Sequence, residues 1–411
     1  MIRSMYSAVA GLRSHQLMMD VVGNNIANVN THGYKRNQVI FQDVLSQLVS
    51  GAAAPTDNLG GKNPVQVGLG VMMAGTAQNF GQGFLQVTNR DLDVAIQGDG
   101  FFVVHEAGEE FFSRAGAFFL DAEGRVVTSD GGLVQGWMAD LEGEFDPATG
   151  LADIRIPNGD QNPPIVTSEI KFGGNLPSQA AVGEQVFTGL EVFDAQGVAV
   201  GLNLTMEKTA LSEWTVTASY GPGQTPITMT DNVLTFTDGE LVIPADFEMN
   251  IAAGQIPGLG DISLVVGGEA ERRVTQFGAS ASVAAATQNG ATAGTLQSMR
   301  VGADGVITGS YSNGLNKPVA RLALANFSNP NGLERVTGSN WRPSVNSGLA
   351  QIGTMGTGGR GSVAPGTLEM SNVDLALEFT TLIQSQRGFQ ASSRVVTAAD
   401  ELLQEIVNLK R

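Results

Sequence analysis

The chain contains no cysteine and only three histidines, and it has no long apolar run. The absence of cysteine excludes disulfides, thiolate nucleophiles and cysteine-based zinc sites. The histidines are far apart in the sequence and share no metal-ligand spacing: His15, His32 and His105. No apolar stretch approaches the roughly 20 residues of a membrane-spanning helix. We therefore expect no metal, no cofactor and no membrane insertion.

The sequence also lacks the glycine-rich loops of nucleotide-binding sites. Gly61-Lys62 has Thr56 where a P-loop needs a glycine, and Asn63 follows it. Gly98-Asp-Gly100 has no third glycine and opens a strand, so a tight turn is the better interpretation. No Gly-x-Ser-x-Gly nucleophile elbow occurs.

One acidic group could be interpreted as catalytic. Asp91, Asp93 and Asp99 offer the two carboxylates that a glycosidase requires. The alternation of Asp91 and Asp93 places both on one strand face, where we expect a solvated edge instead. The sequence thus predicts no catalytic residues, and an enzyme is not expected.

Basic residues are in the minority. The formal net charge is −17, from 40 acidic and 23 basic residues, which argues against nucleic acid and anionic membranes as partners. Residues 146–285 hold 17 acids and 5 bases, whereas residues 1–36 have a net charge of +3. We expect the acidic stretch to be a solvated outer surface, with a Ca²⁺ or cationic-ligand site as the alternative.

The N-terminus does not resemble a cleaved signal peptide. Arg13, His15 and Gln16 interrupt the apolar region that such a peptide needs. The protein is therefore expected either to stay in the cytosol or to leave uncleaved by another route.

Glycine is in excess, with 53 of 411 residues, or nearly twice the usual share of about 7%. The excess indicates many tight turns and a β-rich body. From about residue 77 the apolar period changes to two, and turns are predicted at Asp121-Ala-Glu-Gly124 and Asp130-Gly-Gly132. We expect an irregular linker over 35–76, an inner β domain from 77–150 and 287–370, and an inserted outer β-barrel or sandwich over 151–286.

Both ends carry apolar stripes with the three-and-four spacing of a coiled-coil seam. The N-terminal stripe consists of Ile2, Met5, Val9, Leu12, Met19 and Ile26. The C-terminal stripe consists of Leu375, Phe379, Leu382, Gln386, Phe389, Val396, Leu403 and Val407. These stripes predict a helix over 3–29, within a segment 1–34, and a second helix within 371–411.

Four residues suggest how these helices end and pack. Gly33 suits the left-handed position after the first helix. Gly23 falls on the first stripe, where a missing side chain would permit close helix approach. Ser371 is expected to cap the second helix, with Asp374 at its third position, close to a capping box.

The segment from Gly23 to Lys35, which reads GNNIANVNTHGYK, resembles the signature of the bacterial flagellar axial family of rod, hook and hook-associated proteins. Asn24, Asn25 and Asn28 carry its pattern. The resemblance to this family extends over about residues 1–145 and 290–411, and it includes the segments 98–104, 113–116, 369–374 and 386–391.

The resemblance implies a mainly β protein with paired terminal coiled-coil helices that self-assembles into a helical homopolymer. The stripe residues and the three asparagines would form the assembly surface. Length and a single inserted domain are similar to the hook members, and a rod or junction protein is the alternative. Some hook proteins are cross-linked through a cysteine-derived residue, which this chain lacks.

The implied neighbours are distal rod, hook cap and hook–filament junction proteins, and the flagellar export apparatus. In the free chain the stripes would lack partners, so we expect the terminal helices to be largely disordered until assembly. A wall-associated enzyme with an axial anchor and an intramolecular coiled-coil adhesin are the alternatives from other classes.

Overall fold

The structure is a computed structural model that describes residues 2–55, 60–140, 143–156, 159, 161–242, 248–266 and 273–408. The chain is mainly β with one helix near each end, which confirms the expected fold class. It divides into two compact units. Unit 1 comprises Met1–Pro157, Met299–Thr308 and Pro318–Arg411, and unit 2 comprises Asn158–Ser298 and Gly309–Lys317. The second unit therefore differs from the expected 151–286 insert, because it also takes residues up to 298 and a later segment.

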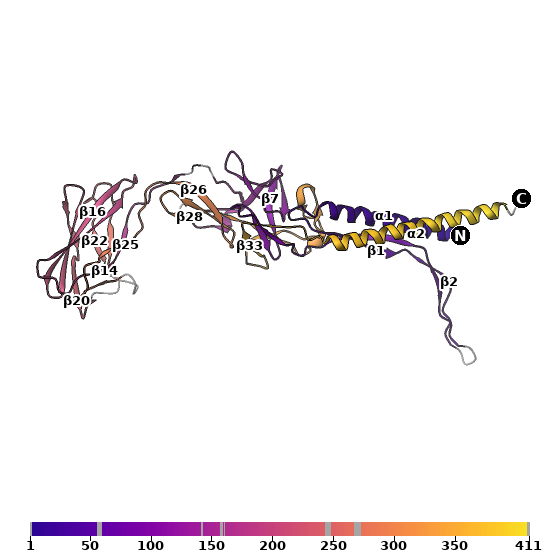
Figure 1. Cartoon of the computed structure of the whole chain (residues 1–411), viewed down its shortest axis with the longest axis horizontal. Coiled ribbons are helices and arrows are strands. Elements are labelled where there is room, and N and C mark those ends of the chain that lie inside the picture. Colours follow the sequence, from indigo (N-terminus) through magenta and orange to yellow (C-terminus); the bar gives the residue numbers. More distant parts are fainter. Residues whose placement is uncertain are drawn as a thin grey trace. The chain divides into compact units, whose positions relative to one another are not determined.

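The two terminal helices are α1 (Ile2–Ala27) and α2 (Leu375–Asn408), which lie side by side and antiparallel (Figure 1). A Cβ on Gly11 would lie 3.1 Å from Ser392 Oγ, and a Cβ on Gly388 would lie 2.4 Å from the His15 ring. One glycine on each helix thus lets the backbones approach closely. The role expected for Gly23 was wrong, because nothing lies within 4 Å of its Cβ position. Neither described helix is long and apolar enough to cross a bilayer.

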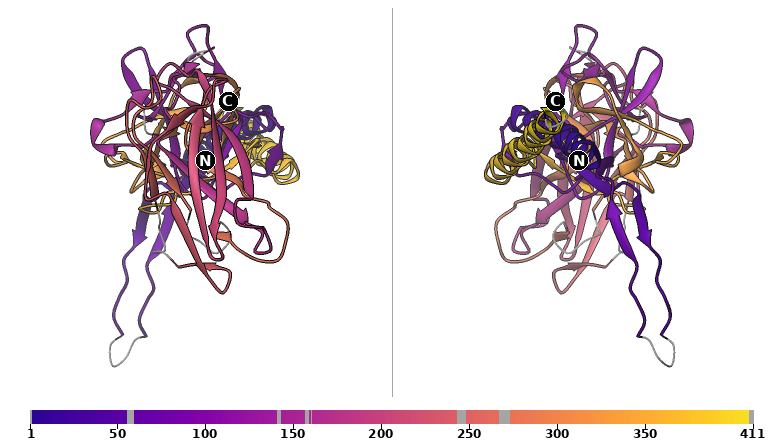
Figure 2. Two further views of the ribbon diagram at one scale, coloured as in Figure 1. Left: turned by 90° about the vertical axis from the view of Figure 1, so that its left-hand side faces the viewer. Right: turned by 90° about the vertical axis from the view of Figure 1, so that its right-hand side faces the viewer.

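A long arm of paired strands follows α1. Strand β1 (Asn37–Asp43) pairs with β4 (Val71–Gln78), and β2 (Ser46–Ser50) pairs with β3 (Val65–Gly68), in antiparallel register. Figure 2 shows this arm running away from the helices. The irregular linker expected over 35–76 is therefore wrong. Every residue of β2 and β3 is exposed, so these strands have no buried face to create an alternating pattern.

The β body of unit 1 is built from antiparallel strands, with β28, β11, β7, β8, β31 and β30 adjacent in that order. Strands β5 and β6 pair with β34 and β33, which lead into α2. The body contains β5 (Leu85–Val87), β6 (Val94–Gln97), β7 (Phe101–Glu106), β8 (Glu109–Ser113), β9 (Phe119–Leu120), β10 (Val126–Val127), β11 (Leu133–Met138), η1 (Pro147–Thr149), β12 (Ala152–Asp153), β29 (Leu324–Asn326), η2 (Pro330–Gly332), β30 (Glu334–Arg335), η3 (Thr337–Ser339), β31 (Asn340–Arg342), β32 (Gln351–Gly353), β33 (Ser362–Pro365) and β34 (Thr367–Glu369).

Aromatic rings fill part of this body. Phe101 packs edge-to-face on Phe327 and Trp341, with centroids 5.8 and 5.4 Å apart, and Phe112 packs on Phe327 at 4.8 Å. The turn expected at 121–124 joins β9 to β10, and the turn expected at 130–132 joins β10 to β11, which confirms both. Three strands contain residues of both units: β26 (Gly294–Val301), β27 (Val306–Tyr311) and β28 (Asn316–Leu322).

Unit 2 contains two sheets around one apolar core. The first sheet has β19, β22, β23, β14 and β24 in order, with β25 on β14, and the second has β15, β16, β17, β20 and β21, with β18 on β17. Trp214, Phe172 and Leu204 are among the fully buried core residues. The strands are β13 (Gln161–Asn162), β14 (Glu169–Asn175), β15 (Gln185–Phe193), β16 (Ala199–Ala210), β17 (Glu213–Tyr220), β18 (Thr225–Ile227), β19 (Met229–Thr230), β20 (Val233–Thr237), β21 (Glu240–Leu241), β22 (Glu248–Ile251), β23 (Ile262–Val265), β24 (Val274–Thr275) and β25 (Ala284–Gln288).

Candidate functional site

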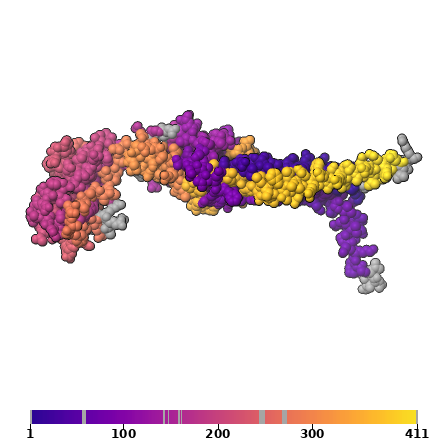
Figure 3. All heavy atoms as spheres, viewed as in Figure 1, coloured from indigo at the N-terminus to yellow at the C-terminus, as the bar shows by residue number. Residues whose placement is uncertain are grey.

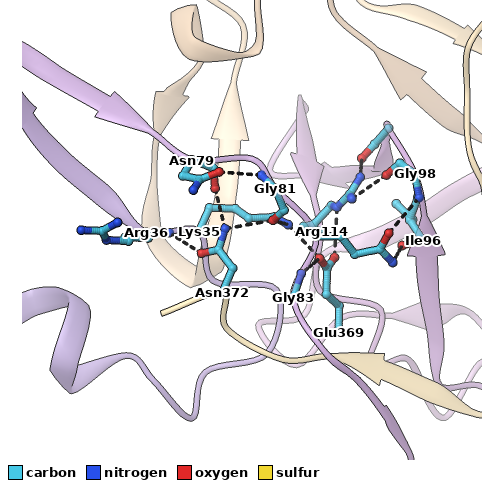
Figure 4. A network of polar contacts seen from close by, with 12 residues as sticks. Lys35, Arg36, Asn79, Gly81, Gly83, Ile96, Gly98, Arg114, Glu369 and Asn372 are labelled. Atoms are coloured by element: carbon cyan, nitrogen blue, oxygen red, sulfur yellow. Dashed lines mark hydrogen bonds and ion pairs between the residues drawn. The ribbon is translucent and has the colours of Figure 1, made fainter. Parts of the chain in front are cut away.

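A buried carboxylate ties the two ends of the chain to the β body (Figure 4). Glu369, the last residue of β34, accepts from Lys35 Nζ at 2.8 Å and from Arg114 Nε at 3.1 Å. The backbone N–H of Gly83 donates to the same carboxylate at 2.8 Å. All three charged side chains are at most 4% exposed. Loss of Glu369 would leave the two buried cations without their counter-charge.

Backbone carbonyls complete the coordination of the two cations. Arg114 donates to the carbonyls of Gly98, at 2.6 Å, and Gly100, while Lys35 Nζ donates to Gly81 O at 3.0 Å. Burial lowers the pKa of Lys35, the nearby Arg114 guanidinium lowers it further, and Glu369 opposes both effects. The result is a lysine pKa below its ordinary value of 10.5.

A second buried acid lies one turn into α2. Glu378 pairs with Arg36 Nε, and its other oxygen accepts from Asn25 Nδ2 at 3.2 Å. Asn25 also donates to Asn37 O at 2.8 Å and accepts from Asn37 N at 3.1 Å. We call Lys35, Arg36, Arg114, Glu369 and Glu378 together the polar node. Its two acids come from the C-terminal part of the chain and are matched by cations more than 250 residues away.

Asn372 joins the two halves of the node. Its Oδ1 accepts from Arg36 N at 2.8 Å, and its Nδ2 donates to Asn79 O at 2.7 Å and Gly81 O at 2.9 Å. The strand before α2, the loop after α1 and the end of the arm are therefore held by one side chain (Figure 4).

The loop that ends α1 is closed by its own asparagines. Tyr34 Oη donates to Asn24 Oδ1 at 2.8 Å and to Asn25 Oδ1 at 3.1 Å. Asn28 donates to Asn24 O at 2.8 Å and accepts from Thr31 at 3.1 Å. These contacts are internal to the subunit, so the asparagine signature fixes the direction in which the chain leaves the helix.

Gly33 adopts the left-handed conformation expected for it, with φ of 68°. Its N–H donates to Glu369 O at 2.8 Å, and a Cβ would lie 2.7 Å from Ala115 N. Both the backbone angle and the lack of space exclude a larger residue at this position.

The cap of α2 differs from the one expected. The carboxylate of Asp374 accepts from Ala376 N at 2.9 Å and Leu377 N at 3.2 Å, so Asp374 is the N-cap and the helix begins at Leu375. Ser371 is buried, and its hydroxyl has no hydrogen-bond partner among the described residues. The residues between Ser371 and Asp374 belong to no helix or strand, and Asn372 among them is held by the end of the arm.

The expected C-terminal stripe runs partly along the buried face of α2. Buried Glu378, Ser385 and Ala399 mark the face of α2 that meets α1. The half-buried stripe members of the two helices are Met5, Val9, Leu12, Met19, Ile26, Leu382, Val396 and Leu403. Exposed stripe members are Leu375, Phe379, Gln386, Phe389 and Val407, and Ile2 is the first residue of α1. Of the three asparagines, Asn25 is buried, Asn28 half-buried and Asn24 exposed.

The residues of the polar node were not among the expected site residues. Lys35, Glu369 and Glu378 stood out only as parts of the family likeness, because ion pairs across such separations leave no local pattern. The aspartates proposed as a solvated pair are also separated: Asp93 is fully buried and accepts from Thr88 Oγ1 at 2.7 Å, whereas Asp91 is exposed. The solvated edge expected for Asp93 was wrong.

Three family models match the chain. Residues 5–35 match the flagella basal body rod protein family, residues 95–173 the flagellar hook protein FlgE/F/G D1 domain, and residues 364–409 the C-terminal region of flagellar basal body rod FlgEFG proteins. The polar node draws Lys35, Arg114 and Glu369 from these three segments in turn. Together they define a structural protein of the flagellar axis.

Full-length relatives narrow this class. The chain is 38% identical to the flagellar hook protein FlgE of Borreliella burgdorferi and 37% identical to that of Treponema pallidum, covering 100% of each protein and of this chain. The fold is similar to the crystal structure of Helicobacter pylori flagellar hook protein FlgE2, with a TM-score of 0.53 and 15% identity over 69% of this chain and 100% of that one. The chain belongs to the flagellar hook protein family and is a structural subunit of the hook.

Proposed function

We propose that this subunit polymerises into a flexible helical tube that joins the rod to the filament and transmits torque, without catalysing a reaction. The observation that carries this proposal is the apolar surface of α2. At 100° per residue, Leu375, Phe379 and Ile383 fall on one side of the seam with α1, and Leu377, Val395 and Leu402 fall on the other. All six are 40–51% exposed.

A helix with apolar side chains on three sides is typical of a buried helix in a bundle. In the subunit α2 has one helical partner, and Figure 3 shows its yellow surface uncovered on the viewed face. Further helices from neighbouring copies would cover both flanks. Such a repeated, head-to-tail contact does not close and therefore produces a helical polymer.

The arm supports the same proposal. Strands β2 and β3 form an isolated two-stranded ladder with exposed Leu48, Val49, Val65 and Val67. A ladder of this kind is marginally stable in water and gains stability when its apolar side chains are covered. Neighbouring copies in the tube would supply that cover.

Unit 2 would form the outer layer of the tube. Residues 146–285 carry 17 acids and 5 bases, so contacts between copies of this region should be polar and shallow. Contacts of that kind can slide while the tube bends. The remaining partners we propose are the distal rod, hook cap and hook–filament junction proteins, reached through the flagellar export apparatus without a cleaved signal peptide.

Electron microscopy of the concentrated, purified chain tests the proposal. Wild type should form tubes, and a Leu375→Ser, Phe379→Ser, Ile383→Ser variant should not. A Gln384→Ser, Gln390→Ser variant, changed at exposed polar positions of the same helix, should form tubes like wild type. Tubes from the apolar-flank variant, or none from wild type at any concentration and salt, would contradict the proposal.

A further inference from the structure

Unit 1 contains an open cleft whose lining includes the charged residues Arg90, Asp130 and Arg335. Its volume is about 550 Å³, and it lies between the loop after α1, the Ser129–Asp130 turn and η3. The lining includes His32, which belongs to the loop after α1, together with Arg90 and Arg335.

Two guanidinium groups line the cleft, each stacked on an aromatic ring. Arg90 Cζ lies 4.7 Å from the centroid of Phe119, and Arg335 Cζ lies 4.3 Å from that of Tyr34. A stacked guanidinium keeps its in-plane N–H groups available for a planar, bidentate acceptor. Arg335 pairs with no carboxylate within the described ranges, and Arg90 has one long contact of 3.5 Å to Asp93.

His32 is a third nitrogen-bearing side chain in the lining of the cleft. Its Nδ1 is buried and has no hydrogen-bond partner in the part of the chain that the structure describes. An unpartnered buried nitrogen is costly, and the His32 ring that carries it lines the cleft and can report on a ligand bound there. Asp130 is the acid of the lining, and it packs against η3 so closely that a Cβ on Gly338 would lie 1.8 Å from its Oδ2. Cationic groups therefore outnumber acidic ones in the cleft.

We propose that this cleft binds a carboxylate, supplied in the polymer by an acidic side chain of a second copy of this chain. The inference rests on the proposed function. It is favoured by charge complementarity, since the chain has 40 acidic and 23 basic residues, so acidic side chains are plentiful on a neighbouring copy. A cationic cleft beside the helix loop gives one such acid a specific place, which fixes how neighbouring copies align.

The carboxylate site is tested on the free, full-length chain below its assembly concentration. With only three histidines, the ring signals of His32, His15 and His105 can be resolved by NMR after histidine labelling. Glutarate should shift the His32 signals in a saturable way and leave those of His105 unchanged, and the neutral analogue glutaramide should shift neither. The shift should be lost in Arg335→Gln. It should persist in Arg342→Gln, where the changed arginine is paired with Glu334 outside the cleft. No saturable His32 shift in wild type overturns the site.

Assembly then tests whether a neighbour supplies the carboxylate. Glutarate should raise the critical concentration of wild type about tenfold, as expected for competition with one charge-assisted bidentate contact. Arg335→Gln should show a similar rise without glutarate and no further response to it. If glutarate binds but neither the anion nor the variant alters assembly, a second copy is excluded as the source. If wild type forms no polymer at all, the proposed function fails while the His32 measurement still decides the site.

Discussion

Single buried charges hold the helical ends of this subunit to its β body. Glu369 accepts from two cations and one backbone N–H, and each partner comes from a different segment of the chain. A buried pair adds little net stability compared with an apolar replacement, but breaking it by removing one partner is costly. Its value here is specificity, since the node permits one arrangement of the segments that leave and enter the helices.

We expect Glu369→Gln to lower the free energy of unfolding of unit 1 by about 3–5 kcal/mol, because Lys35 and Arg114 lose their counter-charge. Denaturant unfolding should be followed in a Trp214→Phe background, so that Trp137 and Trp341 report unit 1 alone. The matched control is Glu334→Gln, which breaks an exposed pair with Arg342 and should leave the midpoint unchanged. Equal midpoints for both variants would show that the node is not needed for stability.

The lowered pKa of Lys35 makes the stability of the subunit depend on pH. Because the folded pKa lies below 10.5, the unfolded chain binds more protons between the two values, and stability contributed by this group rises with pH there. The unfolding free energy of wild type minus that of Lys35→Met should therefore increase as the pH rises from 8 toward 10.5. The subtraction removes other titrating groups. A difference that stays flat or falls over this window would mean that the Lys35 pKa is not lowered by folding.

At the scale of elements, the α1–α2 seam is made of small residues. His15 lies over Gly388 and Ser392 lies over Gly11. Apolar residues with helical spacing lie on both sides of this seam. The helices thus approach closely at these small residues, and α2 keeps exposed apolar side chains on both flanks of the contact.

Glycine substitutions should distinguish the seam from the rest of the helices. Gly23→Ala should raise helix stability by about 1 kcal/mol, because no atom opposes the added methyl group. Gly388→Ala should not raise helix stability, since the added Cβ would meet the His15 ring. Adding His15→Ala to the same chain should restore the stabilising effect of the alanine. Thermal unfolding followed by circular dichroism measures all three. Equal effects of Gly23→Ala and Gly388→Ala would show that the seam tolerates a methyl group.

The sequence predicted the existence and extent of both helices, but not the phase of their contact. Periodicity shows which residues avoid water, and Leu375 or Phe379 satisfies that pattern whether the partner is α1 or another copy. The seam itself contains Glu378 and Ser385, which no hydrophobic pattern selects. The strand at Phe101 was predictable because both of its faces are buried over its first four residues, which produces a continuous apolar run, whereas β2 and β3 were missed because neither of their faces is buried.

Long-range polar contacts were outside the reach of sequence reasoning. Lys35 and Glu369 are 334 residues apart, and neither has a local feature that names the other. The cap at Asp374 was missed for a related reason. Ser371 matches the capping pattern equally well, and the contacts that hold Asn372 to the end of the arm come from residues almost 300 positions away.

At the scale of the whole molecule, the subunit combines well-buried β cores with a C-terminal helix that packs against one other helix. Trp214 and Phe102 are fully buried in the two units, whereas most of α2 is exposed. The node fixes the helix ends at Asn25 and Glu378. Along the same antiparallel register, Leu402 lies beyond Ile2, the first described residue of α1.

This asymmetry predicts the pattern of amide hydrogen exchange. In the free chain, the terminal helices should exchange faster than the strands β7 and β16, with residues 402–408 fastest and the turns nearest the node slowest. Few buried apolar contacts oppose local opening of these helices. In the polymer the same amides should become as protected as the strands, because neighbouring copies cover α2. Mass spectrometry of the two forms measures this directly. Strand-like protection of both helices in the free chain would show that they are complete without neighbours, and that assembly draws its free energy from another surface.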